Sequence, residues 1–279
     1  MSRFIQTNIF VLLILAVSIS AHSSETSTFA PGFTPTPTST YPVVFAPTTI
    51  PTLFATGTPT QTPAPVTETT YVGFGDSYTV GSGVRYEECF FYLVSQKLNA
   101  WFPHVNTVNC GEGGINSADY LKRLDSELSK VKAQHGGPMT RATVLLGIND
   151  LFESRGVTLE KGIANSKIYQ SNLRKIIEGI LKLSPNCAIV LCTVPDPHND
   201  GQGPFLDFVP QGVFEAYRQR VLELGPEKHC RVADLYTVMM GHPEYYFCPI
   251  SWMHTGALGQ YIMAQTIGAQ FSSNPPGVK

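Results

Sequence analysis

The chain has 279 residues, of which 19 are basic and 21 acidic, so its net charge is −2 at neutral pH. This balance excludes a typical nucleic-acid-binding protein, because such proteins carry a strong excess of Lys and Arg. Hydrophobic residues make up 43% of the chain, which excludes a wholly disordered protein, yet charged residues make up only 14%, against about 25% in an ordinary soluble domain. The low charge indicates that part of the chain is not globular.

The first 21 residues predict a secretory signal peptide. Arg3 is the only charged side chain there, an apolar run extends from Ile9 to Ile19, and the small residues Ser20 and Ala21 follow. A basic start, an apolar centre and a small-residue cleavage site are the three parts of such a signal. The alternative is an uncleaved membrane anchor, but the run is shorter than the roughly 20 residues that span a membrane. We therefore expect cleavage after Ser20 or Ala21 and a secreted, extracellular protein.

Residues 22–70 form a second segment of unusual composition. Between positions 25 and 70, 16 residues are Thr and 9 are Pro, and only Glu25 and Glu68 are charged. Because Pro removes backbone N–H donors and favours extended conformations, we expect neither helix nor sheet here. A Thr/Pro-rich tract in a secreted chain is typical of an O-glycosylated stalk, and a plain extended spacer is the alternative.

The remaining residues, 71–279, are enough for one domain. Short apolar runs predict buried strands at 70–75, 105–110, 142–147, 188–194 and 231–235. Segments with helical spacing alternate with them at 88–101, 117–134, 162–183, 211–225 and 256–270. In the helix at 162–183 the expected apolar face consists of Ile168, Leu173, Ile176, Ile177, Ile180 and Leu181. This alternation predicts a three-layer α/β/α fold with a parallel sheet, in which ligands bind at the carboxyl ends of the strands.

The first predicted strand runs into the sequence GFGDSYTVG at residues 73–81. A dinucleotide-binding loop would need a third glycine where Tyr78 stands. An α/β-hydrolase elbow would need a G-x-S-x-G pentapeptide, which does not occur in the sequence. Ser77, at a strand-to-helix turn, is therefore a candidate nucleophile, although Asp-Ser is also an ordinary turn and helix cap.

Three further motifs follow later strands or lie in the last loop: VNCGEGGINSAD at 108–119, LLGINDL at 145–151 and SWMHTGALGQYIMA at 251–264. With the first motif they make the chain resemble the GDSL/SGNH hydrolase (esterase/lipase) family, which is named for Ser, Gly, Asn and His in this order. Here these residues are Ser77, Gly114, Asn149 and His254. The resemblance covers nearly all of residues 71–270 and implies a flavodoxin-like sheet of about five parallel strands.

The resemblance also implies roles, which follow the chemistry of acyl transfer. Ser77 attacks an ester carbonyl and forms an acyl-enzyme, while His254 takes its proton and returns it to the leaving alcohol. The oxyanion hole is expected to consist of the backbone N–H groups of Ser77 and Gly114 and the side-chain amide of Asn149.

The chain departs from the family at one position. The family usually has Asp three residues before the histidine, where this chain has Ser251, although His254 and Gly259 keep the usual H-x-x-x-x-G spacing. The backbone carbonyl of Ser251 or, more weakly, its hydroxyl can accept the Nδ1–H of the histidine. Otherwise the enzyme is poorly active, or an acid from elsewhere, such as Asp196 or Glu244, replaces the missing one.

Other acidic residues are expected to be structural. Asp76 and Asp150 flank two of the motif residues and are expected to make local turn and loop hydrogen bonds. Asp196 and His198 have the spacing of a metal pair, but no third ligand at suitable spacing is near them in the sequence. We therefore expect neither a metal nor another cofactor.

An even number of cysteines behind a signal peptide favours disulfides. The sequence cannot select among the possible pairings. Cys187 and Cys230 begin predicted strands that should be neighbours, so these two could meet, and Cys89 and Cys110 both lie near the carboxyl end of the predicted sheet. Cys192 and Cys248 are left to pair with each other or to remain free, and the apolar surroundings of Cys192 favour a buried thiol. The six residues are Cys89, Cys110, Cys187, Cys192, Cys230 and Cys248.

These observations predict a secreted, monomeric serine carboxylic-ester hydrolase. An acylated, above all acetylated, carbohydrate is the first expectation for its substrate, because stalks of this kind accompany enzymes that degrade polysaccharides. A lipid or a small aliphatic ester is the alternative. An alternative of another class is a secreted non-catalytic binding protein with a degenerate triad. We expect neither a nucleic-acid partner nor stable insertion into a membrane after signal cleavage.

Overall fold

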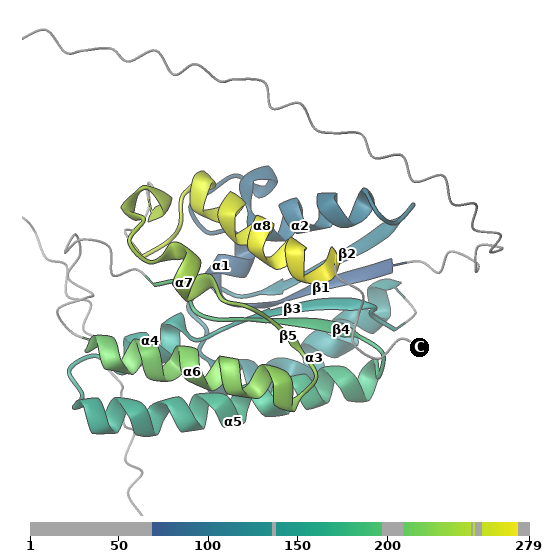
Figure 1. Ribbon diagram of the computed structural model, residues 1–279. Coiled ribbons are helices and arrows are strands. Elements are labelled where there is room, and N and C mark those ends of the chain that lie inside the picture. The colour runs from purple at the N-terminus through teal and green to yellow at the C-terminus, as the bar shows by residue number, and fades with distance from the viewer. Residues whose placement is uncertain (1–68, 136–137, 197–208, 247, 249–252, 273–279) are drawn as a thin grey trace, which may run out of the picture. The chain divides into compact units, whose positions relative to one another are not determined.

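A computed structural model describes residues 69–135, 138–196, 209–246, 248 and 253–272 (Figure 1). The predicted signal peptide and nearly all of the predicted stalk lie outside these residues, and so do His198 and Ser251. Within the described part of the chain, no helix combines the length and the apolar character that a membrane span needs.

The centre of the fold is a five-stranded sheet in which every neighbouring pair is parallel. The strands are β1 (Thr69–Gly75), β2 (Val105–Gly111), β3 (Arg141–Leu145), β4 (Ala188–Cys192) and β5 (Arg231–Ala233), in the order β2-β1-β3-β4-β5. This confirms the predicted flavodoxin-like sheet. β1 begins at Thr69, so the last two residues of the predicted stalk segment belong to the sheet.

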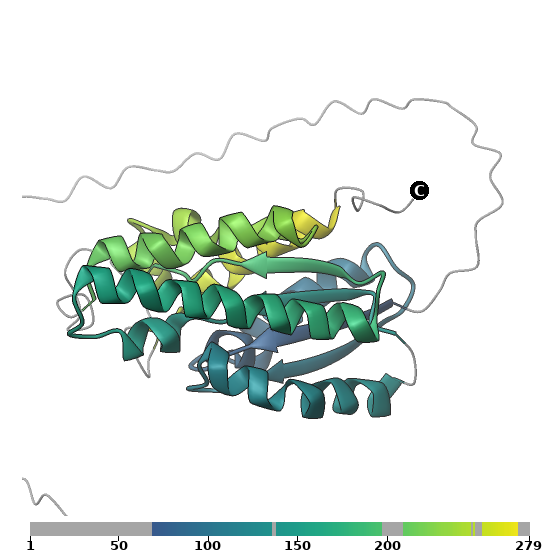
Figure 2. The same cartoon turned by 90° about the horizontal axis from the view of Figure 1, so that it is seen from below.

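Five long helices cover the two faces of the sheet. They are α2 (Phe90–Asn99), α3 (Ser117–His135), α5 (Leu159–Leu183), α6 (Gln211–Glu227) and α8 (Ala257–Ser272). In Figure 1, α2 and α8 lie above the sheet and α3, α5 and α6 below it. Figure 2 shows the lower layer from below, with α5 between α3 and α6. The predicted three-layer α/β/α fold and all five predicted helices are therefore confirmed.

Five short elements were not predicted from the sequence. They are α1 (Ser77–Val80), η1 (Tyr86–Glu88), α4 (Ile148–Glu153), α7 (Leu235–Met239) and η2 (Pro243–Tyr246). The first, α1, directly follows β1, and α4 follows β3, at the same edge of the sheet. These two short helices carry motif residues and so begin the functional site.

The core contains β1 and the apolar faces of the helices. All seven residues of β1 are buried, and Tyr71 stacks on Phe91 of α2 with ring centroids 4.9 Å apart. On α5, Leu173 and its apolar neighbours face the sheet as predicted, but Ile168 is 60% exposed and Tyr169 is buried instead. The prediction for Ile168 was wrong because the buried residues recur at 162, 166, 169, 173, 176 and 180, a helical phase that excludes position 168.

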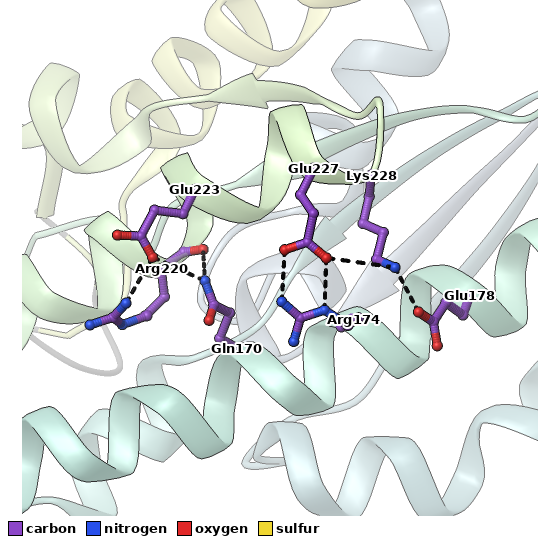
Figure 3. Close-up of polar contacts among 7 residues, drawn as sticks. All are labelled: Gln170, Arg174, Glu178, Arg220, Glu223, Glu227 and Lys228. Carbon is purple, nitrogen blue, oxygen red and sulfur yellow. Dashed lines mark hydrogen bonds and ion pairs between the residues drawn. The ribbon is translucent and has the colours of Figure 1, made fainter.

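On the surface, α5 and α6 are joined by a network of ion pairs (Figure 3). Arg174 donates two hydrogen bonds to the carboxylate of Glu227, at 2.9 and 2.7 Å. Lys228 contacts Glu178 at 2.7 Å and Glu227 at 3.7 Å. The network crosses between two helices that already share a buried face, so it adds charge complementarity to apolar packing.

All six cysteines have free thiols, so the predicted disulfides are not found. Cys89 caps α2 on one face of the sheet, whereas the Cys110 thiol lies beside Glu127 of α3 on the other face, so these two cannot meet. Cys187 and Cys230 are close enough for Cys230 to contribute to the raised pKa of the Cys187 thiol, although burial is the larger cause. Cys192 is buried as a free thiol, the alternative that its apolar neighbours favoured.

Candidate active site

A tight turn at the end of β1 places Ser77 at the start of α1. Asp76 caps this helix, because its Oδ1 accepts the backbone N–H of Tyr78 at 3.0 Å. Gly81 ends the helix in the left-handed conformation, with φ of 81°. The local turn bonding predicted for Asp76 is therefore confirmed, and the cap fixes the residue that precedes the candidate nucleophile.

The structure brings Ser77 and His254 together although 177 positions separate them. Nε2 of His254 lies 2.9 Å from Oγ of Ser77, within hydrogen-bonding distance. Only 8% of Ser77 is exposed. Burial lowers the pKa of His254 below its ordinary 6.5, which favours the neutral imidazole at neutral pH. A neutral imidazole beside a hydroxyl can accept its proton.

The loop that carries the histidine is fixed by the first turn of α8. The side chain of Gln260 accepts the N–H of Phe90 at 2.7 Å and donates to the hydroxyl of Thr255 at 2.9 Å. A Cβ at Gly259 would collide with the carbonyl oxygen of Tyr245. This close approach gives a physical reason for glycine at the fifth position after the histidine.

Gly114 and Asn149 lie on neighbouring segments at the carboxyl edge of the sheet. Gly114 follows β2 and has φ of 79°, a conformation that favours glycine. Asn149 lies in α4 after β3, and its Nδ2 donates to the carbonyl oxygen of Ile115 at 2.8 Å. An amide has two N–H donors, so this bond leaves the second N–H of Asn149 for another acceptor.

Asp150 makes loop hydrogen bonds, as predicted, but to a distant segment. Its Oδ2 accepts the backbone N–H of Ser117 at 2.9 Å, and its Oδ1 accepts the Ser117 hydroxyl at 2.5 Å. Burial raises the pKa of Asp150, and the two bonds from Ser117 oppose this shift. Burial likewise raises the pKa of Asp76 to about 8, with Asp150 as a smaller cause in the same direction.

The second nitrogen of the His254 ring makes no hydrogen bond to any described residue. Nδ1 of His254 is buried and, within the described part of the chain, has no hydrogen-bond partner. Asp196 and Glu244 therefore do not supply the third member in this structure. Glu244 instead contacts His242 at 2.9 Å on the surface. Ser251, the residue predicted to orient the imidazole, lies outside the described residues.

Two polar residues that support the motif residues, Ser117 and Asn172, were not predicted from the sequence. Nδ2 of Asn172, on α5, donates to the Ser117 hydroxyl at 3.0 Å, and both side chains are buried. The position of Ser117 inside the second motif, at the start of the predicted helix 117–134, was the signal that could have found it. Among the residues that the structure describes, no three His, Cys, Asp or Glu side chains gather as metal ligands would.

Comparison with known proteins agrees with this arrangement. The GDSL-like Lipase/Acylhydrolase family profile matches residues 74–261. A comparison with curated protein sequences gives no match.

Several solved structures share the fold. The lipase Lip_vut3 from a goat rumen metagenome is 20% identical with a TM-score of 0.61, and the match covers 72% of this chain and 97% of the lipase. A lipase/acylhydrolase from Enterococcus faecalis is 23% identical with a TM-score of 0.55, covering 75% of this chain and all of the other. The acetyl xylan esterase AlAXEase is 19% identical with a TM-score of 0.51, covering 72% and 98%. The family match spans the turn of Ser77, the segments of Gly114 and Asn149, and His254, and the chain therefore belongs to the GDSL-like lipase/acylhydrolase family of ester hydrolases.

Proposed function

We propose that the chain is a secreted serine esterase in which Ser77 is the nucleophile and His254 the general base and acid. The observation that carries this proposal is the 2.9 Å separation of the Ser77 Oγ and the His254 Nε2. In the first step the Ser77 oxygen bonds to the ester carbonyl carbon while its proton moves to Nε2. Collapse of the tetrahedral intermediate breaks the bond to the alcohol, which takes the proton from the imidazolium. Water then releases the acid by the same steps.

The developing negative charge needs donors that are already in place. The N–H groups of Ser77 and Gly114 and the free N–H of the Asn149 amide are the proposed three. Support comes from the bond between Asn149 and Ile115, since it brings the amide to the residue next to Gly114.

The third group of the triad is proposed to be Ser251, through its backbone carbonyl or its hydroxyl. Either would accept the Nδ1–H of His254 and fix the tautomer that leaves Nε2 free to accept a proton. Support comes from the sequence position, three residues before the histidine. Ser251→Ala separates the two forms: a carbonyl acceptor predicts nearly full activity, and a hydroxyl acceptor predicts a loss close to that of His254→Ala.

The proposed substrate is an acetylated or otherwise acylated carbohydrate outside the cell. Two observations support it: the Thr/Pro-rich segment after a signal-like N-terminus, and a structural neighbour that is an acetyl xylan esterase. The lipases among the neighbours favour a second candidate, a lipid or aliphatic ester. The first proposal predicts a higher kcat/KM for acetylated xylo-oligosaccharides than for long-chain p-nitrophenyl esters, and the reverse ranking supports the second.

Hydrolysis of p-nitrophenyl acetate tests the nucleophile. Ser77→Ala and His254→Ala are expected to lower kcat by roughly 10³-fold or more. Ser129→Ala is the matched control, because its hydroxyl is exposed and bonds the carbonyl of Asp125 within α3. An inactive wild-type protein, or a Ser77→Ala variant as active as wild type, would contradict the proposal.

A further inference from the structure

The segment that follows Gly114 is held by residues of α4. Asn149 donates to the carbonyl oxygen of Ile115 at 2.8 Å, and Asp150 accepts both the N–H and the hydroxyl of Ser117, at 2.9 and 2.5 Å. These three bonds join the loop after β2 to the loop after β3. The two loops flank the turn of β1, because β2 and β3 are the two neighbours of β1 in the sheet.

The bonds of Asp150 are partly buried and directional. Ser117 is fully buried, and its hydroxyl donates to Asp150 while it accepts the Asn172 amide at 3.0 Å. Hydrogen bonds to a carboxylate are stronger than those between neutral groups. A half-buried carboxylate that loses such bonds is destabilised, so Asp150 and Ser117 favour one mutual position.

The segment between Glu112 and Ser117 has little internal support. Gly114 lies in its middle at φ of 79°, and glycine has more backbone freedom than any other residue. The N–H of Ile115 reaches the carbonyl oxygen of Glu112 only at 3.5 Å, a long hydrogen bond. At the start of the segment the N–H of Glu112 donates to the carbonyl oxygen of Gly75 at 3.0 Å. On the far side of Gly114 the contacts at Ile115, Asn116 and Ser117 are all made by residues of α4, and Asp150 makes those at Ser117.

We infer that Asp150 is a positioning residue of the esterase reaction: by holding Ser117 it fixes the Gly114 N–H relative to the Asn149 amide. The inference rests on the proposed function, in which these two donors bind the oxyanion. A donor stabilises the transition state only when it is in place beforehand, and small displacements are expensive. In this inference Asp150 does not contact the substrate. It keeps the loop of Gly114 in the position from which the Gly114 N–H can bind the oxyanion.

The experiment compares Asp150→Ala, Asp150→Asn and wild type in two assays. Steady-state hydrolysis of p-nitrophenyl acetate gives kcat and KM. A burst with diethyl p-nitrophenyl phosphate, which phosphorylates the serine and releases p-nitrophenolate, counts the protein molecules with a competent Ser77–His254 pair. We expect Asp150→Ala to keep the full burst amplitude but to lose roughly 10- to 100-fold in kcat, with KM little changed.

Asp150→Asn tests the geometry of the contact. Its oxygen can still accept the Ser117 N–H, whereas its NH₂ group cannot accept the hydroxyl. We therefore expect a kcat between those of wild type and Asp150→Ala. A kcat above that of wild type would contradict the inference, because it would mean that the charge of Asp150 repels the oxyanion more than its bonds help.

Asp119→Ala is the matched control, because this carboxylate lies in the first turn of α3 as Asp150 lies in the first turn of α4, but it is exposed and pairs with exposed Lys122 at 2.7 Å. If Asp150→Ala fails to fold, Ser117→Ala tests the inference instead. This variant removes the hydroxyl bond to the Asp150 carboxylate and keeps the bond from the backbone N–H. Its expected loss in kcat is smaller, about 3- to 10-fold. Wild-type kcat in Asp150→Ala, or a burst amplitude that falls in step with kcat, would overturn the inference. Both results leave the proposed function intact, because that proposal is tested separately by the activity of wild type and of Ser77→Ala.

Discussion

The hydroxyl of Tyr78 donates a 2.5 Å hydrogen bond to the carbonyl oxygen of Met253. Tyr78 follows Ser77 and Met253 precedes His254, so this one bond joins the chain beside the proposed nucleophile to the chain beside the proposed base. The Tyr78 side chain is almost fully buried, and its ring lies 5.9 Å from the imidazole ring. The distance between Ser77 and His254 is therefore held by a contact outside the reacting pair.

Removing that hydroxyl should weaken catalysis more than folding. In Tyr78→Phe we expect kcat to fall roughly 3- to 10-fold, because the loop of His254 loses an anchor. The loss of one buried hydrogen bond is expected to cost about 1 kcal/mol in the free energy of unfolding. Tyr71→Phe is the control, since it removes a buried hydroxyl that bonds Thr143 at 3.1 Å inside the sheet. Equal kcat values in the two variants would show that the Tyr78 bond does not position His254.

The acid limb of the pH–rate profile should report His254. Since burial lowers the pKa of this imidazole below 6.5, the neutral base persists to lower pH than an exposed histidine would. We expect kcat/KM for a neutral ester to fall as the pH drops, with a midpoint below 6.5, and His242→Gln to leave the midpoint unchanged. A midpoint above 6.5 would indicate a carboxylate beside the imidazolium and so contradict the proposal that Ser251 is the third member.

The buried carboxyl of Asp76 should make stability depend on pH. Its pKa in the folded protein is raised to about 8, from an ordinary 3.8, chiefly by burial. Between these two values the folded state binds more protons than the unfolded state, so the contribution of Asp76 to stability falls as pH rises. Asp76→Asn keeps an oxygen for the Tyr78 N–H and cannot ionise. We therefore expect the Tm of the variant minus that of wild type to increase from pH 4 to pH 8; a constant difference would refute this.

Gly75 is expected to tolerate no side chain. A Cβ there would collide with the carbonyl oxygen of Leu145 on β3 and with the hydroxyl of Thr79. Gly75→Ala should therefore lower the free energy of unfolding by about 3 kcal/mol, measured by urea denaturation. At Gly113 an added Cβ has no neighbour within 4 Å. Gly113→Ala should change stability by less than about 0.5 kcal/mol, and a similar loss in both variants would contradict the role of the Leu145 contact.

The ion pairs between α5 and α6 should matter little despite their geometry. Arg174 and Glu227 form a bidentate ion pair, but their side chains are 32% and 45% exposed. Water and salt screen such pairs. We expect Arg174→Gln to lower Tm by less than about 2 °C, and the loss to shrink in 0.5 M NaCl. A larger loss that salt does not reduce would mean that Arg174 stabilises the fold by packing its stem.

The sequence predicted the sheet and the long helices because their apolar periods are long and regular. It did not predict α1 and α4, because four- and six-residue helices contain too little of a period. Their ends depend instead on particular contacts, such as the Asp76 cap and the left-handed Gly81. The wrong disulfide prediction has a related cause: strand ends indicate the edge of a sheet but not the face on which Cys89 and Cys110 lie.

The motif residues of the site were predicted from their order, whereas their supports were not. Ser117 bonds Asp150 across 33 positions and Asn172 across 55. Polar contacts between segments so far apart leave no periodic pattern in the sequence. Ser77 and His254, by contrast, stand in motifs whose residue types are set by the chemistry, so each could be named before the structure placed them together.

The order of the strands has a consequence for how this fold can change its substrate. β1 lies between β2 and β3, so the loops after these two strands reach over the end of β1 from opposite sides. In this chain Asn149 and Asp150 join those loops across the gap. Exchanging one loop alone would then leave the half-buried carboxylate of Asp150 or the buried hydroxyl of Ser117 without this partner. The two loops therefore depend on each other, and transferring a substrate preference from one member of this fold to another would require both loops.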